Sequence, residues 1–223
     1  MSELLNKIKT RGHWRVLIRP NRFVENRIPV ISDLYRILEK TSVRLRGWDF
    51  PHLDPSAQPH VDANWVGQEF EWDMYLEIWR FYQSGQFVHI SGMPSDWRDQ
   101  SGLSPVDQNW KPSAWLGIGD TLFTFQEVFE LAARLALTAA GDEQMRVEVT
   151  ASGLEGRALL VDSHRRLPMF REHRASIHEL PYKIDIGQAD LVADPREFAL
   201  KAAVELFRRF NWEPSLQMLQ EWY

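Results

Sequence analysis

The chain contains no cysteine and no long apolar run. Because it has no thiol, it has no disulfide framework, thiolate zinc site, cysteine nucleophile or iron–sulfur cluster. No stretch reaches the roughly 18 consecutive apolar residues of a membrane helix, and the N-terminal MSELLNKIKTRGHW does not resemble a signal peptide. We therefore expect a cytoplasmic protein that does not enter a membrane.

The sequence also lacks the short motifs that mark common nucleotide and catalytic sites. There is no Walker A loop, no G-x-G-x-x-G, no G-x-S-x-G elbow, no H-E-x-x-H and no EF-hand loop. Gly117-Ile118-Gly119 precedes an expected helix and offers amides to a phosphate, but Asp120 competes for them. Asp162-Ser163-His164 holds the residue types of a nucleophilic triad, but adjacent side chains cannot form one. We predict no cofactor.

Length and composition are those of a soluble single domain spanning residues 1–223. Hydrophobic residues make up 44% of the chain and charged residues 26%. The chain contains ten tryptophans, which is many for this length. A buried aromatic ring removes roughly 150–250 Å² from water, a gross gain of about 4–6 kcal/mol. Most of the tryptophans are therefore expected in the core.

Charge is distributed unevenly along the chain. Residues 1–50 hold 11 Lys/Arg against 5 Asp/Glu, whereas residues 51–110 hold 2 against 9. A basic N-terminal region on an acidic body can steer an anionic partner. The same basic residues can instead dock on the acidic half of the chain or remain solvated, and we favour this second interpretation.

Hydrophobic periodicity predicts an α+β fold. Alternation indicates strands at 13–19, 43–46, 75–82, 86–92, 146–151, 157–161 and 180–186. Two hairpins are expected, one across Ser84-Gly85 and one across residues 152–156. Helices are expected at 32–40, 120–140 and 194–210, with a short one after Glu213.

We therefore predict a mainly antiparallel sheet or sheets of about 7–8 strands packed with three main helices. The order of the elements also allows two βββα-like halves, 13–140 and 146–223, that meet face to face. Residues 94–117 are expected to form a long irregular connection, and a loop of that length is usually functional or poorly ordered.

The stretch RLRGWDFPH contains the first candidate ligand-binding residues, Arg44, Arg46, Trp48 and Asp49. On a strand, Arg44 and Arg46 point to the same side and can hold a phosphate while Trp48 stacks on a base. Alternatively, the two arginines pair across strands with three acids, a common arrangement worth about 0.2–1 kcal/mol per pair. Those acids are Glu69, Glu71 and Asp73. We favour the cross-strand pairs.

The hairpin at 75–92 contains the other candidates, His89, Arg80 and Tyr82. His89 lies on one face of its strand, and Arg80 and Tyr82 share a face of the partner strand, so together they are candidates for the floor of a pocket. A single histidine on an apolar face is more often a hydrogen-bonded core residue.

Two His-x-Asp units, His52/Asp54 and His60/Asp62, are candidate metal ligands, since imidazole and carboxylate suit zinc, manganese or iron. They lie in a loop with three prolines, where Asp before Pro is ordinary turn chemistry. The simpler prediction is that both aspartates cap turns and both histidines are solvated.

The segments RGHWRVLIRP, VRLRGWDFPH, WRFYQSGQFVH, FTFQEVFELAARLAL and LKAAVELFRRFNWEPS occur in this order over nearly the whole chain. With them the sequence resembles an uncharacterised group of bacterial hypothetical proteins without known function. The resemblance implies a bacterial, cytosolic, stand-alone domain and carries no mechanism.

Three functions follow as hypotheses. The first is a non-catalytic binding or interaction protein that uses 44–49, 75–92 and 94–117 and binds a protein partner or a small anionic ligand. The second is a nucleic-acid or nucleotide binder, in which Trp48 stacks on a base and arginines contact phosphates. Those arginines are Arg11, Arg15, Arg19, Arg22, Arg44 and Arg46. The third is a metal-dependent hydrolase that uses His52, Asp54, His60 and Asp62. The C-terminal Trp222-Tyr223 also suggests docking, for example across a homodimer.

Overall fold

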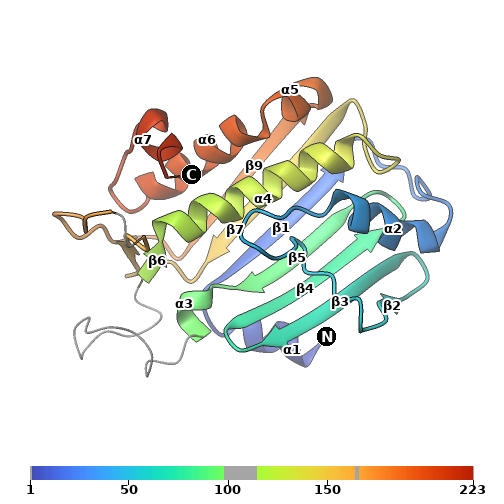
Figure 1. Cartoon of the computed structure of the whole chain (residues 1–223), viewed down its shortest axis with the longest axis horizontal. Helices are drawn as coiled ribbons and strands as arrows, with labels where there is room; N and C mark the ends of the chain where they lie inside the picture. The colour runs from blue at the N-terminus through green and yellow to red at the C-terminus, as the bar shows by residue number, and fades with distance from the viewer. Residues whose placement is uncertain (1, 98–114, 164–165, 223) are drawn as a thin grey trace.

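A computed structural model describes residues 2–97, 115–163 and 166–222. Its strands are β1 (His13–Pro20), β2 (His60–Val61), β3 (Trp65–Trp72), β4 (Tyr75–Tyr82), β5 (Phe87–Gly92), β6 (Trp115–Gly117), β7 (Gln144–Ser152), β8 (Ala158–Leu160) and β9 (Glu179–Gly187). Seven of them form one antiparallel sheet in the order β2-β3-β4-β5-β1-β7-β9 (Figure 1). The predicted α+β class with a mainly antiparallel sheet is confirmed.

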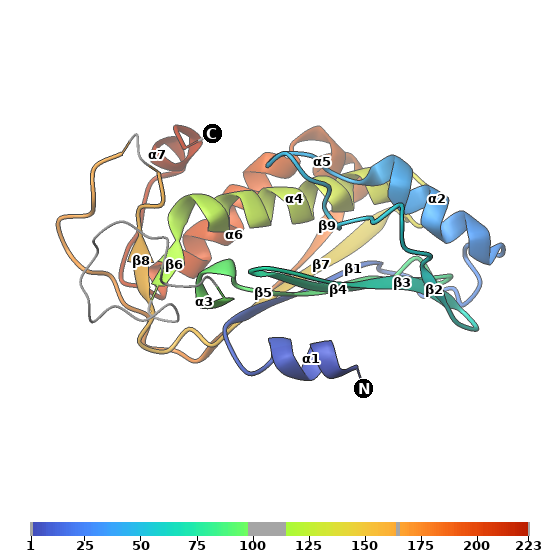
Figure 2. The same cartoon turned by 60° about the horizontal axis from the view of Figure 1, so that its bottom comes forward.

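Three sizeable helices cover one face of this sheet. They are α2 (Ile31–Thr41), α4 (Ile118–Ala136) and α6 (Pro195–Arg208), as the sequence pattern predicts. Figure 2 shows all three on the same side of the sheet, with α1 (Glu3–Ile8) alone on the opposite side. The shorter helices are α3 (Pro94–Trp97), α5 (Gln188–Ala193) and α7 (Leu216–Gln220). Among the described helices, none is long and apolar enough to cross a membrane.

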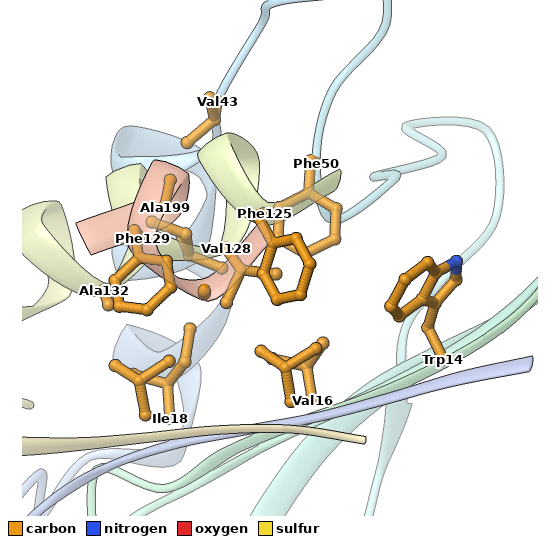
Figure 3. Packing of buried hydrophobic residues seen from close by; sticks show 14 of the residues in the cluster. Trp14, Val16, Ile18, Val43, Phe50, Phe125, Val128, Phe129, Ala132 and Ala199 are labelled. Atoms are coloured by element: carbon orange, nitrogen blue, oxygen red, sulfur yellow. The ribbon is translucent and has the colours of Figure 1, made fainter. Parts of the chain in front are cut away.

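The main core lies between the sheet and α4. Trp14, Val16 and Ile18 alternate along β1 and point toward α4, where Phe125 and Phe129 meet them (Figure 3). The Trp14 and Phe125 rings pack edge to face, with centroids 5.7 Å apart. Because β1 pairs with both β5 and β7, this core connects the N-terminal and C-terminal parts of the chain.

The hairpin of β4 and β5 is confirmed, and its register determines which residues share a face. Gly85 has a φ of +83° at the turn, a conformation that glycine adopts without strain. A side chain there would also begin 2.7 Å from the backbone oxygen of Ala140. The register places Trp79 opposite His89 and Arg80 opposite Val88. His89 therefore faces α4, and Arg80 lies on the other face of the sheet.

Two predicted strands have different structures. Residues 43–46 do not form a strand; the chain makes only an isolated bridge between Val43 and Phe50. The hairpin predicted across 152–156 is also wrong, because β7 pairs with β9 while β8 pairs with β6 in parallel. The backbone groups of a three-residue strand such as β8 can form hydrogen bonds with β6 or with β7. The alternation of apolar residues does not show which of the two strands is the partner.

The two predicted halves do not meet face to face, because β1 and β7 are neighbours in one sheet. The helix predicted at 120–140 begins earlier, at Ile118, and ends at Ala136. At the ends of the predicted 94–117 connection the chain forms α3 and β6. Residues 98–114, between them, lie outside the described part of the chain.

Candidate functional site

A cavity of about 540 Å³ lies beside the N-terminus of α4. We call it the outer cavity. Segments far apart in the sequence line it, including Trp48, the first residue of β4 and the chain around α3 and β6. Its volume is within the range of about 300–1,000 Å³ that is typical of small-molecule sites.

The 44–49 segment turns Arg44 and Arg46 in different directions. Since these residues are not on a strand, they do not share a face as predicted. The Arg44 side chain is 75% exposed and pairs with Asp49, whereas that of Arg46 is 20% exposed and reaches α4. Neither arginine pairs with Glu69, Glu71 or Asp73, so the cross-strand interpretation is wrong.

Two carboxylates of α4 bind the Arg46 guanidinium. Its Nε donates to Glu127 at 3.0 Å, and its two terminal nitrogens donate to Asp120 and Glu127 at 2.5 Å each. Burial would lower the pKa of Arg46, but Asp120 and Glu127 raise it well above its ordinary value. Burial also raises the pKa of Glu127, although Arg46 opposes this shift. Arg46 therefore has its charge neutralised within the protein.

A third carboxylate, from Asp162, occupies the N-terminus of α4. Its two oxygens accept hydrogen bonds from the amides of Gly119 and Asp120, each at 2.8 Å. The carboxylate fits there because Gly117 and Gly119 have no side chains; an added Cβ would lie 2.2 Å and 2.9 Å from its oxygens. The amides that the sequence offered to a phosphate are thus bonded to Asp162. Enclosure by the chain, together with Asp120, raises the pKa of Asp162 although these amides lower it.

Aromatic rings form much of the wall of the outer cavity. They are Trp48, Tyr75, Trp115, Phe123 and Trp222. The Trp48 ring packs edge-on against Tyr75, with centroids 5.2 Å apart, and the Arg46 guanidinium lies 5.6 Å from its centroid. Arg166 lies over Trp222 at 4.5 Å. Contacts within the chain therefore account for Trp222, and Tyr223 lies outside the described residues.

His89 lies below the outer cavity, in the core. It is 3% exposed and lines an inner cavity of about 60 Å³, which also touches Arg46 and Trp48. Its Nε2 lies 3.1 Å from Glu77, whose carboxylate also accepts the amide of His52 at 2.8 Å. Burial would raise the pKa of Glu77, but His89 and this amide outweigh burial and lower it. His89 is thus a buried core residue beside the carboxylate of Glu77.

Arg80 and Tyr82 do not form a floor beneath His89, so this grouping of predicted residues is wrong. They lie on the opposite face of the sheet, where Arg80 stacks on the Trp65 ring at 4.3 Å. Tyr82 also packs near Trp65, with a centroid distance of 6.4 Å. The expected grouping was off by one residue in register, and a shift of one residue exchanges the faces of a strand.

The two His-x-Asp units line a separate cavity of about 560 Å³ at the β2–β3 edge of the sheet. His52 packs on Phe70 and His60 on Trp65. Asp54 accepts from the amide and hydroxyl of Ser56, at 2.8 and 2.6 Å, and Asp62 accepts the amide of Ala63 at 2.7 Å. The aspartates therefore cap turns. In the described part of the chain, no three His, Asp or Glu residues are close enough to hold a metal ion.

The basic N-terminal residues do not form one surface. Arg15 lies on the face of β1 opposite Trp14 and Val16, away from α4, whereas Arg46 bonds to α4. Arg11 stacks on Trp97 at 4.3 Å, and Arg22 pairs with Asp142 at 3.4 Å. Lys7 pairs with Glu71 of the acidic segment. Part of the basic region thus docks on the protein itself.

No protein-family model, curated protein or solved structure matches this chain. The resemblance to a bacterial group therefore remains a prediction. The sequence did not suggest Glu127, and it singled out Asp120 and Asp162 for other reasons than the ones seen here: Asp162, not Asp120, takes the amides of α4. Asp120 and Glu127 are seven residues apart on one helix, a spacing that places both on the same face, and this was the available signal. Nothing in the sequence indicated Asp162 as the residue that caps this helix.

Proposed function

We propose that the protein is a non-catalytic binding protein that takes a small ligand into the outer cavity. One observation carries the proposal: the 44–49 segment, the start of β4 and the chain around α3 and β6 line one cavity of ligand size. Trp48 is 41% exposed at this cavity, and an exposed large aromatic ring is a common feature of recognition surfaces.

The position of His89 supports binding rather than catalysis. His89 and Glu77 form a pair of the kind that transfers protons, but the inner cavity beside them measures only about 60 Å³. That space accommodates water and excludes a substrate of several atoms. A proton-transfer step needs the reacting group within about 3 Å of the base.

The two alternative functions have less support. The arginines expected to contact nucleic acid lie on different faces and are engaged with their own neighbours. The four residues proposed for a hydrolase have separate turn and ring contacts. We also propose that the protein acts in the bacterial cytoplasm, because the group of proteins that the sequence resembles is bacterial and cytosolic.

The proposal can be tested by thermal unfolding in the presence of a library with equal numbers of cationic, neutral and anionic small molecules. A ligand at about 100 times its Kd stabilises the folded protein by about 2.7 kcal/mol. For a chain of this size that corresponds to a rise in Tm of roughly 5–11 °C. We expect at least one compound to produce this rise in the wild type and not in Trp48→Ala.

Phe23→Ala is the matched control, because Phe23 is an exposed aromatic residue that does not line the cavity. It should respond to ligands like the wild type. The proposal is wrong if no compound raises the Tm, or if Trp48→Ala responds to every compound as the wild type does. Native mass spectrometry of the same samples gives the stoichiometry and shows whether a second copy of the chain is bound.

A further inference from the structure

Both features of the outer cavity that could bind an anion are already occupied by carboxylates. The Arg46 guanidinium is shared by Asp120 and Glu127, and the N-terminal amides of α4 are taken by Asp162. An anionic ligand would have to displace one of these carboxylates, and then face the other two. The small anionic ligand predicted from the sequence is therefore disfavoured here.

The charged groups that remain give the cavity a negative character. Among the residues that the structure describes, the charged side chains that line it are Arg46, Asp120 and Asp162. Glu127, behind them, also pairs with Arg46. Within the described ranges, no cationic side chain lies within ion-pair distance of Asp162. The Asp120 side chain also remains 32% exposed, so it can accept a further donor.

We infer that the ligand of the outer cavity is an organic cation, an alkylammonium or guanidinium group whose charge lies at Asp162 and Asp120 and whose carbon chain packs on the aromatic wall. The inference rests on the proposed function, since it specifies the ligand of the same cavity. Two further observations support it, one from the carboxylates and one from the rings.

Asp120 and Asp162 repel each other. This repulsion is one of the causes that raise the pKa of Asp162. A cation bound between the two carboxylates would relieve the repulsion, and each charge-assisted hydrogen bond would add to the affinity. Neutral and anionic ligands gain nothing from this arrangement.

The rings of the wall already hold cations that belong to the protein. Arg46 lies beside Trp48 at 5.6 Å, and Arg166 lies over Trp222 at 4.5 Å. Both distances are within the roughly 6 Å over which a cation is attracted to the face of an aromatic ring. The wall has the chemistry to hold a ligand cation and to cover an attached apolar chain.

An organic cation fits this cavity better than a metal ion does. No group of three metal-ligating side chains occurs among the residues that the structure describes, so a bare ion would find few ligands. A molecule with an apolar chain would instead use the aromatic wall and the volume of about 540 Å³.

The test uses three probes of nearly equal size: pentylammonium, pentanol and pentanoate. Isothermal titration calorimetry of the full chain should show binding of pentylammonium, at least about 10-fold weaker binding of pentanol, and no binding of pentanoate. Asp162→Asn should weaken pentylammonium binding by about 10- to 100-fold and leave the affinity for pentanol unchanged. Asparagine keeps one acceptor oxygen for the amides of α4, where Asp162 uses two, so a urea unfolding curve checks that the variant is folded before binding is measured.

Asp33→Asn is the matched control, because it removes the same charge from α2, where Asp33 pairs with Arg36 outside the cavity. It should bind pentylammonium like the wild type. Tighter binding of pentanoate than of pentylammonium, or an unchanged affinity in Asp162→Asn, overturns the inference.

The two proposals fail in different ways. If pentanol or pentanoate binds best and Trp48→Ala removes that binding, the binding function stands and the cationic ligand is wrong. If neither the three probes nor any library compound binds, both are wrong. Nα-acetyl-lysine methylamide, which represents a lysine within a protein chain, distinguishes two sources of the cation. If it binds more tightly than pentylammonium, the ligand is a lysine of a partner protein. If it binds equally or more weakly, the ligand is a free amine.

Discussion

Replacing Arg46 by methionine should cost a large part of the stability of the protein. The Arg46 side chain makes three hydrogen bonds to two carboxylates, and the Glu127 side chain is fully buried. Methionine fills most of the volume and leaves Glu127 without a positive partner. Breaking a buried ion pair in this way typically costs about 3–5 kcal/mol. A folded domain has about 5–15 kcal/mol in total, so the loss is severe.

Urea unfolding followed by tryptophan fluorescence measures this loss. We expect the free energy of unfolding of Arg46→Met to fall by about 3–5 kcal/mol at pH 7. The double variant Arg46→Met/Glu127→Gln should recover most of the loss, because it removes the buried charge as well. Asp120 keeps access to water and contributes less to the effect.

The loss should also depend on pH. Without Arg46 the folded-state pKa of Glu127, already raised by burial, rises further above its value in the unfolded chain. The folded protein then binds more protons than the unfolded chain, so its stability falls as the pH rises. The difference between Arg46→Met and the wild type should therefore be small near pH 4 and grow toward pH 7, across the range set by the ordinary pKa of about 4.3 for glutamate.

Arg44→Met is the control for Arg46→Met. Arg44 lies two residues away, has the same charge and is mostly exposed, so the loss of its pair with Asp49 should leave the urea midpoint close to that of the wild type. If Arg46→Met is within about 1 kcal/mol of the wild type, or if Glu127→Gln recovers nothing in the double variant, our account of this cluster is refuted.

Two further predictions concern charged residues elsewhere in the interior of the fold. Glu77→Gln should make the free energy of unfolding less sensitive to acid. The pKa of Glu77 is lowered in the folded protein, so its carboxylate stabilises the wild type above the ordinary pKa of 4.5, and this stability is lost as the pH falls through the folded-state pKa. Equal acid sensitivity of the two proteins would contradict this. Arg157→Met should lower the free energy of unfolding by about 3–5 kcal/mol, because it leaves Asp96 buried without the partner it now meets at 2.6 and 2.7 Å; a urea curve like that of the wild type would contradict it.

The sequence by itself determined the elements whose pattern is local. The alternation of β1, the hairpin of β4 and β5 and the amphipathic stripe of α4 all repeat over a few residues, and a strand or helix imposes those periods directly. Asp194 followed by Pro195 predicted the start of α6, where the Asp194 side chain does accept the amide of Glu197. The α+β class followed from the order of these elements.

Register and partner choice were decided by the tertiary structure. The turn after β4 pairs Trp79 with His89, and a register different by one residue would have placed Arg80 and Tyr82 on the face of His89. The short strand β8 pairs with β6 rather than β7, which no local pattern indicates.

The candidate site combines both kinds of information. The sequence identified Arg46 and Trp48 as residues of interest, since arginine can hold a phosphate while a neighbouring aromatic ring stacks on a base. It did not indicate their partners: Asp120 and Glu127 are 74 and 81 residues from Arg46, and Asp162 is 43 residues from the Gly119 amide that it accepts. Only the packing of α4 against the sheet brings these carboxylates together. Because of them the cavity has a negative character, whereas the arginines of the sequence alone suggested a positive one.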